Sequence, residues 1–290
     1  MYAITGITGK VGGEIARHLI GQGESVRAVV RNPAKAADWA AMGCDIAIAD
    51  MADAEQLASA FTGVEGVFIL PPSDFDPAPG YPEAKRVIES MCRALTKAGP
   101  PRIVCLSTIG ADATHDNLLT QRTLMEQSLN AIGLPVTFLR PGWFMENALW
   151  DVASARDEGV LRSFLQPADR AFPMVATKDV GRLAGDLIRQ DTSETRIVEL
   201  EGAVRISANE LARAFSQVLG RPVRVEIVPR ETWEGLFRAQ GMKNPLPRMR
   251  MLDGFNEGWI EFQDRGRSAV KGKTPLVEVI TALVAGGNAT

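Results

Sequence analysis

A glycine-rich turn close to the first residue constrains the fold of this chain more than any other feature. The segment Thr5–Gly13 reads TGITGKVGG and stands between a short apolar run and an amphipathic stretch. Gly6 permits a tight turn, Gly9 lets a backbone approach a pyrophosphate, and Gly12 lets a helix pack close to a strand. The unpaired N–H groups at the start of that helix favour phosphate groups. We therefore expect a strand–turn–helix unit that binds a dinucleotide; a glycine-rich turn without a ligand is the alternative.

The first half of the chain alternates short apolar runs with amphipathic stretches. We expect strands at Tyr2–Thr5, Ser25–Val30, Asp45–Ala49, Gly66–Leu70, Arg102–Leu106 and Val136–Leu139. Helices are expected between them at Val11–Gly21, Ala34–Met42, Ala54–Phe61, Glu83–Ala98 and Leu118–Ile132. The strands lack polar–apolar alternation, as expected when helices cover both faces of a parallel sheet. The pattern predicts an α/β fold, a Rossmann-type doubly wound parallel sheet with a smaller mixed α/β lobe at the C-terminal end.

The regular alternation of strands and helices ends after Arg140. We expect a turn at 141–145, a helix capped by Asp179, and a helix that begins with a capping box from Ser207 to Glu210. The predicted organisation is an NAD(P)-binding Rossmann domain over 1–150 and a smaller substrate-side lobe over 151–290. Whether some later elements return to the first sheet is left open.

Composition excludes several classes of function. The 290 residues are 46% hydrophobic and carry a formal net charge of −3, so no basic field favours nucleic acid or an anionic membrane. No apolar run approaches the ~20 residues that span a bilayer. Three scattered cysteines and two histidines argue against a disulfide framework or a metal site. No signal peptide is visible, and we expect a cytoplasmic protein.

The end of the second predicted strand bears on the choice of cofactor. NAD-dependent enzymes commonly place an acidic residue there to bind the ribose hydroxyls. This chain has Arg31 after Val30, with Lys35 close by. A guanidinium matches a 2′-phosphate in charge and geometry, which favours NADPH over NADH. The alternative is an arginine that is merely solvated in a surface loop.

Several motifs resemble those of the short-chain dehydrogenase/reductase superfamily, and more narrowly its atypical NmrA-like branch, which includes NADPH-dependent quinone reductases and triphenylmethane reductases. They are the glycine turn, Val30-Arg31-Asn32, Asp50, Ser107-Thr108, Glu126, Leu134–Gly142, Asn147 and Thr274-Pro275-Leu276. With the glycine turn and Arg31, the resemblance predicts a set of cofactor-binding residues. They are Gly6, Thr8, Gly9, Lys10, Val11, Gly12, Arg31, Lys35, Asp50, Met51, Leu70, Pro71, Ser107, Arg122 and Pro141.

The catalytic residues are the open question. Most short-chain dehydrogenases use a Tyr-x-x-x-Lys pair on the helix after the fifth strand. Tyr81 and Lys85 match that spacing but precede Ser107, and no tyrosine follows it. In the NmrA-like branch the later helix often shows Lys-x-x-x-Glu, and here Arg122 takes the lysine place and Glu126 the glutamate place. Arginine is a poor proton donor. We therefore regard the Tyr81–Lys85 pair as fortuitous and leave the catalytic residues unassigned.

The absent pair favours acceptors that need no general acid. A quinone takes a hydride readily, and water can protonate its oxyanion afterwards. Candidates for the substrate side are Trp143, Phe144, Asn147 and Ser107, where the two aromatic rings are equally compatible with core packing between the lobes.

We expect an NADPH-dependent reductase of a quinone-like or other small planar electrophilic acceptor. The main alternative is a non-catalytic NADP(H)-binding redox sensor of NmrA type, and an isoflavone-reductase-like enzyme is a third. The expected partner is a small-molecule substrate, with a homodimer as a possible assembly.

Overall fold

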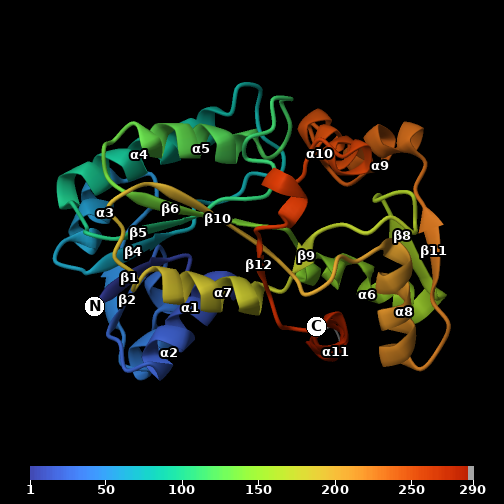
Figure 1. Ribbon diagram of the computed structural model, residues 1–290, viewed down its shortest axis with the longest axis horizontal. Coiled ribbons are helices and arrows are strands. Elements are labelled where there is room, and N and C mark those ends of the chain that lie inside the picture. Colours follow the sequence, from blue (N-terminus) through green and yellow to red (C-terminus); the bar gives the residue numbers. More distant parts are fainter. Residues whose placement is uncertain (287–290) are drawn as a thin grey trace.

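A parallel sheet of eight strands forms the centre of the larger lobe in this computed structural model, which describes residues 1–286 (Figure 1). The strand order is β12-β10-β6-β5-β4-β1-β2-β3. The strands are β1 (Tyr2–Thr5), β2 (Val26–Val30), β3 (Asp45–Ile48), β4 (Gly66–Ile69), β5 (Ile103–Leu106), β6 (Val136–Pro141), β10 (Arg196–Glu201) and β12 (Val270–Lys271). The Rossmann-type sheet and its first six predicted strands are therefore confirmed.

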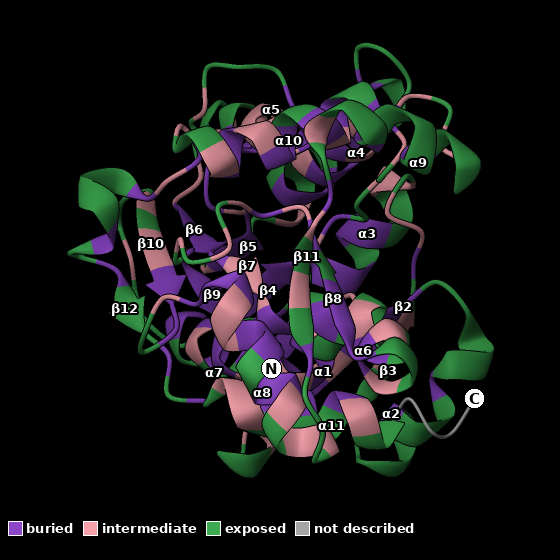
Figure 2. Cartoon of the chain, turned by 90° about the vertical axis from the view of Figure 1, so that its right-hand side faces the viewer, coloured by how far each residue is buried: buried purple, intermediate pink, exposed green. Residues whose placement is uncertain are grey.

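Helices cover both faces of this sheet. Helices α3 (Ala54–Phe61), α4 (Pro82–Ala98) and α5 (Thr120–Asn130) pack on one face. Helices α1 (Lys10–Gly21), α2 (Ala37–Ala41) and α7 (Thr177–Leu187) pack on the other. The apolar stripe of α1, with Val11, Ile15 and Leu19, is buried as its helical spacing predicts. Figure 2 shows the result, with β4, β5 and β6 buried along their length.

The smaller lobe lies beside the sheet and has its own core. It contains η2 (Met145–Asp151), α6 (Val152–Glu158), β8 (Val160–Ser163), α8 (Ala208–Leu219), β11 (Arg224–Ile227), η3 (Arg230–Thr232), α9 (Trp233–Ala239), α10 (Leu246–Glu257) and α11 (Leu276–Gly286). Phe215, Trp233 and Phe237 are completely buried in its core. The predicted capping box is present, since Ser207 and Glu210 exchange hydrogen bonds at the start of α8.

The helix expected at Ala34–Met42 is shorter than predicted. A 3-10 turn, η1 (Pro33–Lys35), precedes α2, and the Asn32 side chain caps it by accepting a hydrogen bond from the Ala34 N–H. The turn expected at 141–145 is also wrong. Trp143–Phe144 forms strand β7, which pairs with β9 (Met174–Val175), because the partner strand supplies the backbone hydrogen bonds.

The prediction that Asp179 caps α7 is wrong as well. Glu146 binds the first residue of that helix, accepting hydrogen bonds from the Thr177 N–H and hydroxyl. The Asp179 carboxylate instead accepts hydrogen bonds from the backbone N–H groups of Lys273 and Thr274. These contacts attach α7 to the segment that carries β12 and η4 (Gln263–Gly266). The strands β10 and β12 thus join the first sheet, although they follow residue 150.

Candidate active site

The glycine turn joins β1 to α1 with the geometry that a bound dinucleotide requires. Gly6 has a φ of +64°, and a Cβ there would lie 2.9 Å from the Leu70 side chain. A Cβ on Gly12 would lie 2.3 Å from the Gly6 carbonyl oxygen, so no side chain fits. Gly9 is extended, exposed and less confined, since its Cβ would approach only that same oxygen, at 3.3 Å. The fold therefore demands Gly6 and Gly12, whereas Gly9 keeps open the space in front of the helix.

Thr5 fixes the strands on either side of this turn, and sequence reasoning missed it. Its buried hydroxyl donates to the Phe68 carbonyl oxygen at 3.1 Å and accepts from the Leu70 N–H at 2.8 Å. These bonds hold the carboxyl ends of β1 and β4 together. The chain reverses its direction of strand addition between these strands, which is where ligands bind in open α/β sheets. A threonine directly before the first glycine was the available signal.

The residues expected at the 2′-phosphate end are exposed at the end of β2. Arg31 and Lys35 both face solvent, and among residues 1–286 neither forms an ion pair. Thr8 and Lys10 are exposed in the glycine turn, while Val11 is buried beneath it. Asp50 and Met51 follow β3 and are partly buried, and the Asp50 carboxylate accepts a hydrogen bond from the Ala52 N–H at 2.8 Å. The exposed positive side chains are thus free to meet a phosphate.

Arg122 holds the loop that follows β4. Its guanidinium donates to the Pro71 carbonyl oxygen at 3.1 Å and to the Ser73 hydroxyl at 2.7 Å. The adjacent Gln121 donates to the Asp74 carbonyl oxygen at 2.8 Å. Arg122 therefore uses its hydrogen bonds to hold the loop that carries Leu70 and Pro71. The sequence did not indicate this role.

The same loop is bound to the smaller lobe. The Asp76 carboxylate accepts hydrogen bonds from the Lys243 and Asn244 N–H groups at 2.8 and 2.7 Å. These two bonds hold the pKa of Asp76 below its ordinary value. The Asn244 amide returns a bond to the Pro77 carbonyl oxygen. The loop thus connects the lobes on the side where the strands end.

Ser107 belongs to a buried polar network at the end of β5. Its hydroxyl donates to the Glu126 carboxylate, which Arg140 binds through two nitrogens at 2.9 and 2.6 Å. Arg140 also contacts Asp112 at 3.0 Å. Burial alone would lower the pKa of Arg140, but the two carboxylates raise it above its ordinary value. The network directs the Ser107 proton towards the Glu126 carboxylate.

The remaining substrate-side candidates lie after β6. Pro141 is buried at its end, and Trp143 is half-buried with its ring edge-on to Phe255 at 5.3 Å between centroids. Phe144 is half-buried against the sheet core, and Asn147 is exposed. The structure thus gives each ring a packing partner and also leaves part of it accessible.

Tyr81 lies at the start of α4 in the left-handed region, with a φ of +58°. Its hydroxyl lies 2.7 Å from the Asp116 carboxylate and 2.9 Å from the Asn117 carbonyl oxygen, and can donate its single proton to these protein acceptors. Burial, and then the Asp116 contact, raise the pKa of this phenol. Lys85 is exposed on the helix. The phenol proton is thus engaged in a hydrogen bond to an acceptor of the protein itself.

A model of the NmrA-like family matches residues 2–259. The chain belongs to this family. It is 28% identical over 260 residues to an NAD(P)H azoreductase of Xenophilus azovorans, covering 89% of this chain and 85% of that protein. It is 30% identical over 284 residues to a (4-alkanoyl-5-oxo-2,5-dihydrofuran-3-yl)methyl phosphate reductase of Streptomyces griseus, covering 97% and 93%.

A solved structure shares this fold over nearly the full length. It is the NADPH-dependent quinone oxidoreductase QOR2 of Escherichia coli in complex with NADPH. The TM-score is 0.81 at 26% identity, with 98% of this chain and 99% of that chain covered.

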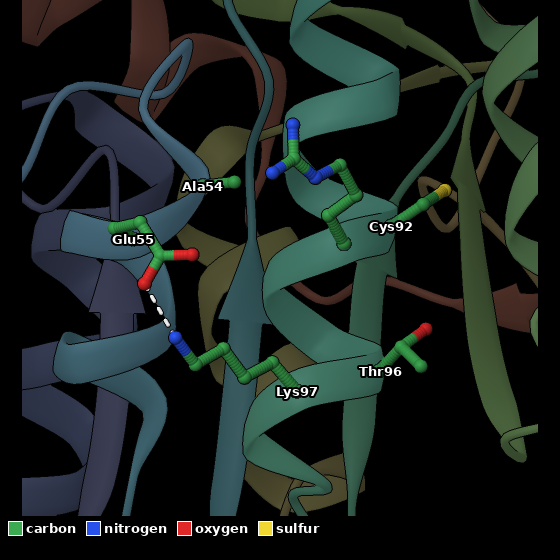
Figure 3. A pocket seen from close by; sticks show the side chains of 6 residues that line it. Ala54, Glu55, Cys92, Thr96 and Lys97 are labelled. Carbon is green, nitrogen blue, oxygen red and sulfur yellow. Dashed lines mark hydrogen bonds and ion pairs between the residues drawn. The ribbon is translucent and has the colours of Figure 1, made fainter.

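A surface groove on this NmrA-like protein lies apart from the site. It runs between α3 and α4, has a volume of about 420 Å³, and is lined by residues that include Glu55, Cys92 and Lys97 (Figure 3). Lys97 pairs with Glu55 across it, and the Cys92 side chain points away from that pair. None of its lining residues belongs to the glycine turn or to the predicted cofactor set.

Within residues 1–286, no helix is long and apolar enough to cross a membrane. The same residues contain no group of three or more His, Cys, Asp or Glu side chains that could hold a metal ion.

Proposed function

We propose that this protein is an NADPH-dependent reductase that delivers a hydride to a quinone-like or other small planar electrophilic acceptor, without a Tyr-x-x-x-Lys pair. The observation that carries the proposal is the glycine turn, whose exposed, Cβ-free Gly9 directly precedes α1 beside the joined ends of β1 and β4. The relatives support the reaction class, because their names describe reductases that act on different electrophiles with nicotinamide cofactors.

NADPH fits the residues present. The start of α1 and the glycine turn would hold the pyrophosphate, since their N–H groups are unhindered by side chains. Arg31 and Lys35 would hold the 2′-phosphate, because both are exposed cations that form no ion pair with a carboxylate of residues 1–286. Leu70 and Pro71 would lie against the nicotinamide end, held there by Thr5 and Arg122. When bound, the reduced nicotinamide supplies the hydride.

The protein's own residues position the cofactor and the acceptor, and they do not supply a proton. The Ser107 hydroxyl donates a hydrogen bond to the Glu126 carboxylate, and the Tyr81 hydroxyl donates to the Asp116 carboxylate or the Asn117 carbonyl oxygen. Neither is therefore free to protonate an acceptor. An acceptor whose product anion takes its proton from water suits such a site, and a ketone suits it poorly.

The test is NADPH oxidation with a panel of quinones, preceded by a fluorescence titration with NADPH. Turnover of at least one quinone, with a simple aliphatic ketone left unreduced, is the expected result. Tight NADPH binding without turnover of any acceptor would contradict the reductase function and favour a redox sensor.

The assembly and the cellular location stay predictions from the sequence, a homodimer and the cytoplasm. Light scattering during size-exclusion chromatography tests the first, and cell fractionation tests the second.

A further inference from the structure

A cavity of about 200 Å³ lies where the two lobes meet, and none of its lining residues belongs to the predicted cofactor set. Three segments enclose it: the end of the loop after β4, the end of the loop after β5, and the first turns of α10. Its lining includes Pro79, Tyr81, Asp116, Leu246 and Arg250.

The position of the cavity connects it to the site. Both loops leave the sheet at the carboxyl ends of neighbouring strands, the edge at which open α/β sheets bind ligands. The first loop starts at Leu70, and the second follows Ser107. Helix α10 is attached over their far ends, because the Leu118 N–H donates to the Pro247 carbonyl oxygen at 2.9 Å. The cavity therefore lies between loops that begin at the carboxyl ends of β4 and β5, the edge of the sheet that also carries the candidate site.

One cation that lines this cavity, Arg250, is exposed and forms no ion pair with any residue in 1–286. Its only hydrogen-bond contact there is a long one, 3.4 Å from Nη1 to the Asp116 carbonyl oxygen. Its charge acts on Tyr81, where it opposes the larger effect of burial on the pKa of the phenol. Most donors of the guanidinium are thus available to a ligand.

The groups around Arg250 in the cavity determine which kind of ligand would fit. One Asp116 carboxylate oxygen accepts a hydrogen bond from the Tyr81 hydroxyl at 2.7 Å, so this oxygen is engaged on the Tyr81 side of the cavity. Pro79 and Leu246 give an apolar wall, and Leu246 is 48% exposed although it is a large hydrophobic residue. An apolar ring with one anionic group would meet both the wall and the guanidinium.

We propose that this cavity is the part of the acceptor site that receives an anionic substituent, such as a sulfonate, carboxylate or phosphate, and that Arg250 determines the preference for anionic over neutral acceptors. The inference rests on the proposed reductase function and names the class of acceptor.

The experiment compares two acceptors that differ only in charge, 1,4-naphthoquinone and 1,4-naphthoquinone-2-sulfonate, with the NADPH-loaded protein. Arg250→Gln should lower kcat/KM for the sulfonate about tenfold, the size of one charge-assisted hydrogen bond, and leave the neutral quinone within about twofold. Arg250→Lys should retain part of the preference, because the charge stays. Lys243→Gln is the matched control, since it removes an exposed cation nearby that does not line the cavity. Equal losses for both quinones in Arg250→Gln would overturn the proposal.

A second measurement tests whether the anion site and the acceptor site are the same. Naphthalene-2-sulfonate, which cannot accept a hydride, should inhibit reduction of 1,4-naphthoquinone competitively in the parent protein and far less in Arg250→Gln. Non-competitive inhibition would mean a separate anion site and would overturn the assignment to the acceptor.

If neither quinone turns over although NADPH binds, the proposed function has failed. Calorimetry with naphthalene-2-sulfonate then decides about Arg250 alone, and absence of binding, or equal binding to Arg250→Gln, would reject the site.

Discussion

Arg140 binds Glu126 through two nitrogens, at 2.9 and 2.6 Å, and both side chains are less than a tenth exposed. Removal of Glu126 takes the two-nitrogen partner from the buried Arg140 guanidinium and leaves it with Asp112, whose side chain is 43% exposed. Glu126→Ala should therefore lower the free energy of unfolding by about 3–5 kcal/mol. Glu55→Ala is the control, because its pair with Lys97 is exposed and contributes at most about 1 kcal/mol. Urea denaturation of both variants measures the difference, and similar losses would contradict it.

The choice of cofactor can be tested at the end of β2. A charge-assisted bond to the 2′-phosphate is worth ~1.5–3 kcal/mol, so Arg31→Ala should weaken NADPH binding roughly 10- to 150-fold. Binding of NADH should barely change, because it lacks that phosphate. Calorimetric titration of both cofactors measures this, and equal losses would exclude a role for Arg31 in phosphate recognition.

The glycine turn allows folding and binding to be separated. Gly9→Val should leave the circular dichroism spectrum intact and abolish binding of either cofactor, because Gly9 is extended and its Cβ branch would enter the pyrophosphate space. Gly12→Ala should instead lower the melting temperature, because its Cβ would lie 2.3 Å from the Gly6 oxygen. Normal NADPH affinity in a folded Gly9→Val variant would mean that the turn is only structural.

The Tyr81 hydroxyl should be dispensable for the reaction. Tyr81→Phe removes contacts to Asp116 and Asn117, so a loss of stability of roughly 1 kcal/mol is expected, with kcat kept within a few-fold. Trp143→Ala or Phe144→Ala should reduce turnover more, through lost stacking and looser positioning. Steady-state NADPH oxidation with one good acceptor compares the three variants. A fall of ~10² for Tyr81→Phe alone, as expected on loss of a general acid, would show that the Tyr81–Lys85 pair is catalytic.

Asp151 makes stability depend on pH. Burial raises the pKa of this carboxyl to about 7. The folded protein therefore holds a proton that the unfolded chain releases at lower pH, and stability falls as the pH rises from about 4 through 7. Asp151→Asn removes the penalty, so its melting temperature should exceed that of the parent at pH 8 and match it near pH 4. A constant difference across this range would show that the carboxyl titrates normally.

The sequence by itself determined the parts of this protein that depend on near neighbours. The six strands follow from short apolar runs, and the helix stripe of α1 and the capping box of Ser207 follow from spacings of three or four residues. The glycine turn could be predicted as well, since Gly6 and Gly12 belong to one short segment and approach each other within the turn. The NmrA-like family could also be recognised, because its motifs are short segments.

Only the tertiary structure decided the contacts between distant segments. Asp179 binds Thr274, which is 95 residues away, and Thr177 is bound by Glu146 from 31 residues away, so the expected helix cap was assigned to the wrong carboxylate. The pairing of Trp143–Phe144 with β9, and the cavity that Tyr81 and Arg250 share, likewise depend on how the lobes meet. A carboxylate or a guanidinium can satisfy its hydrogen bonds with any donor or acceptor that the fold brings near, and local sequence does not encode which one arrives.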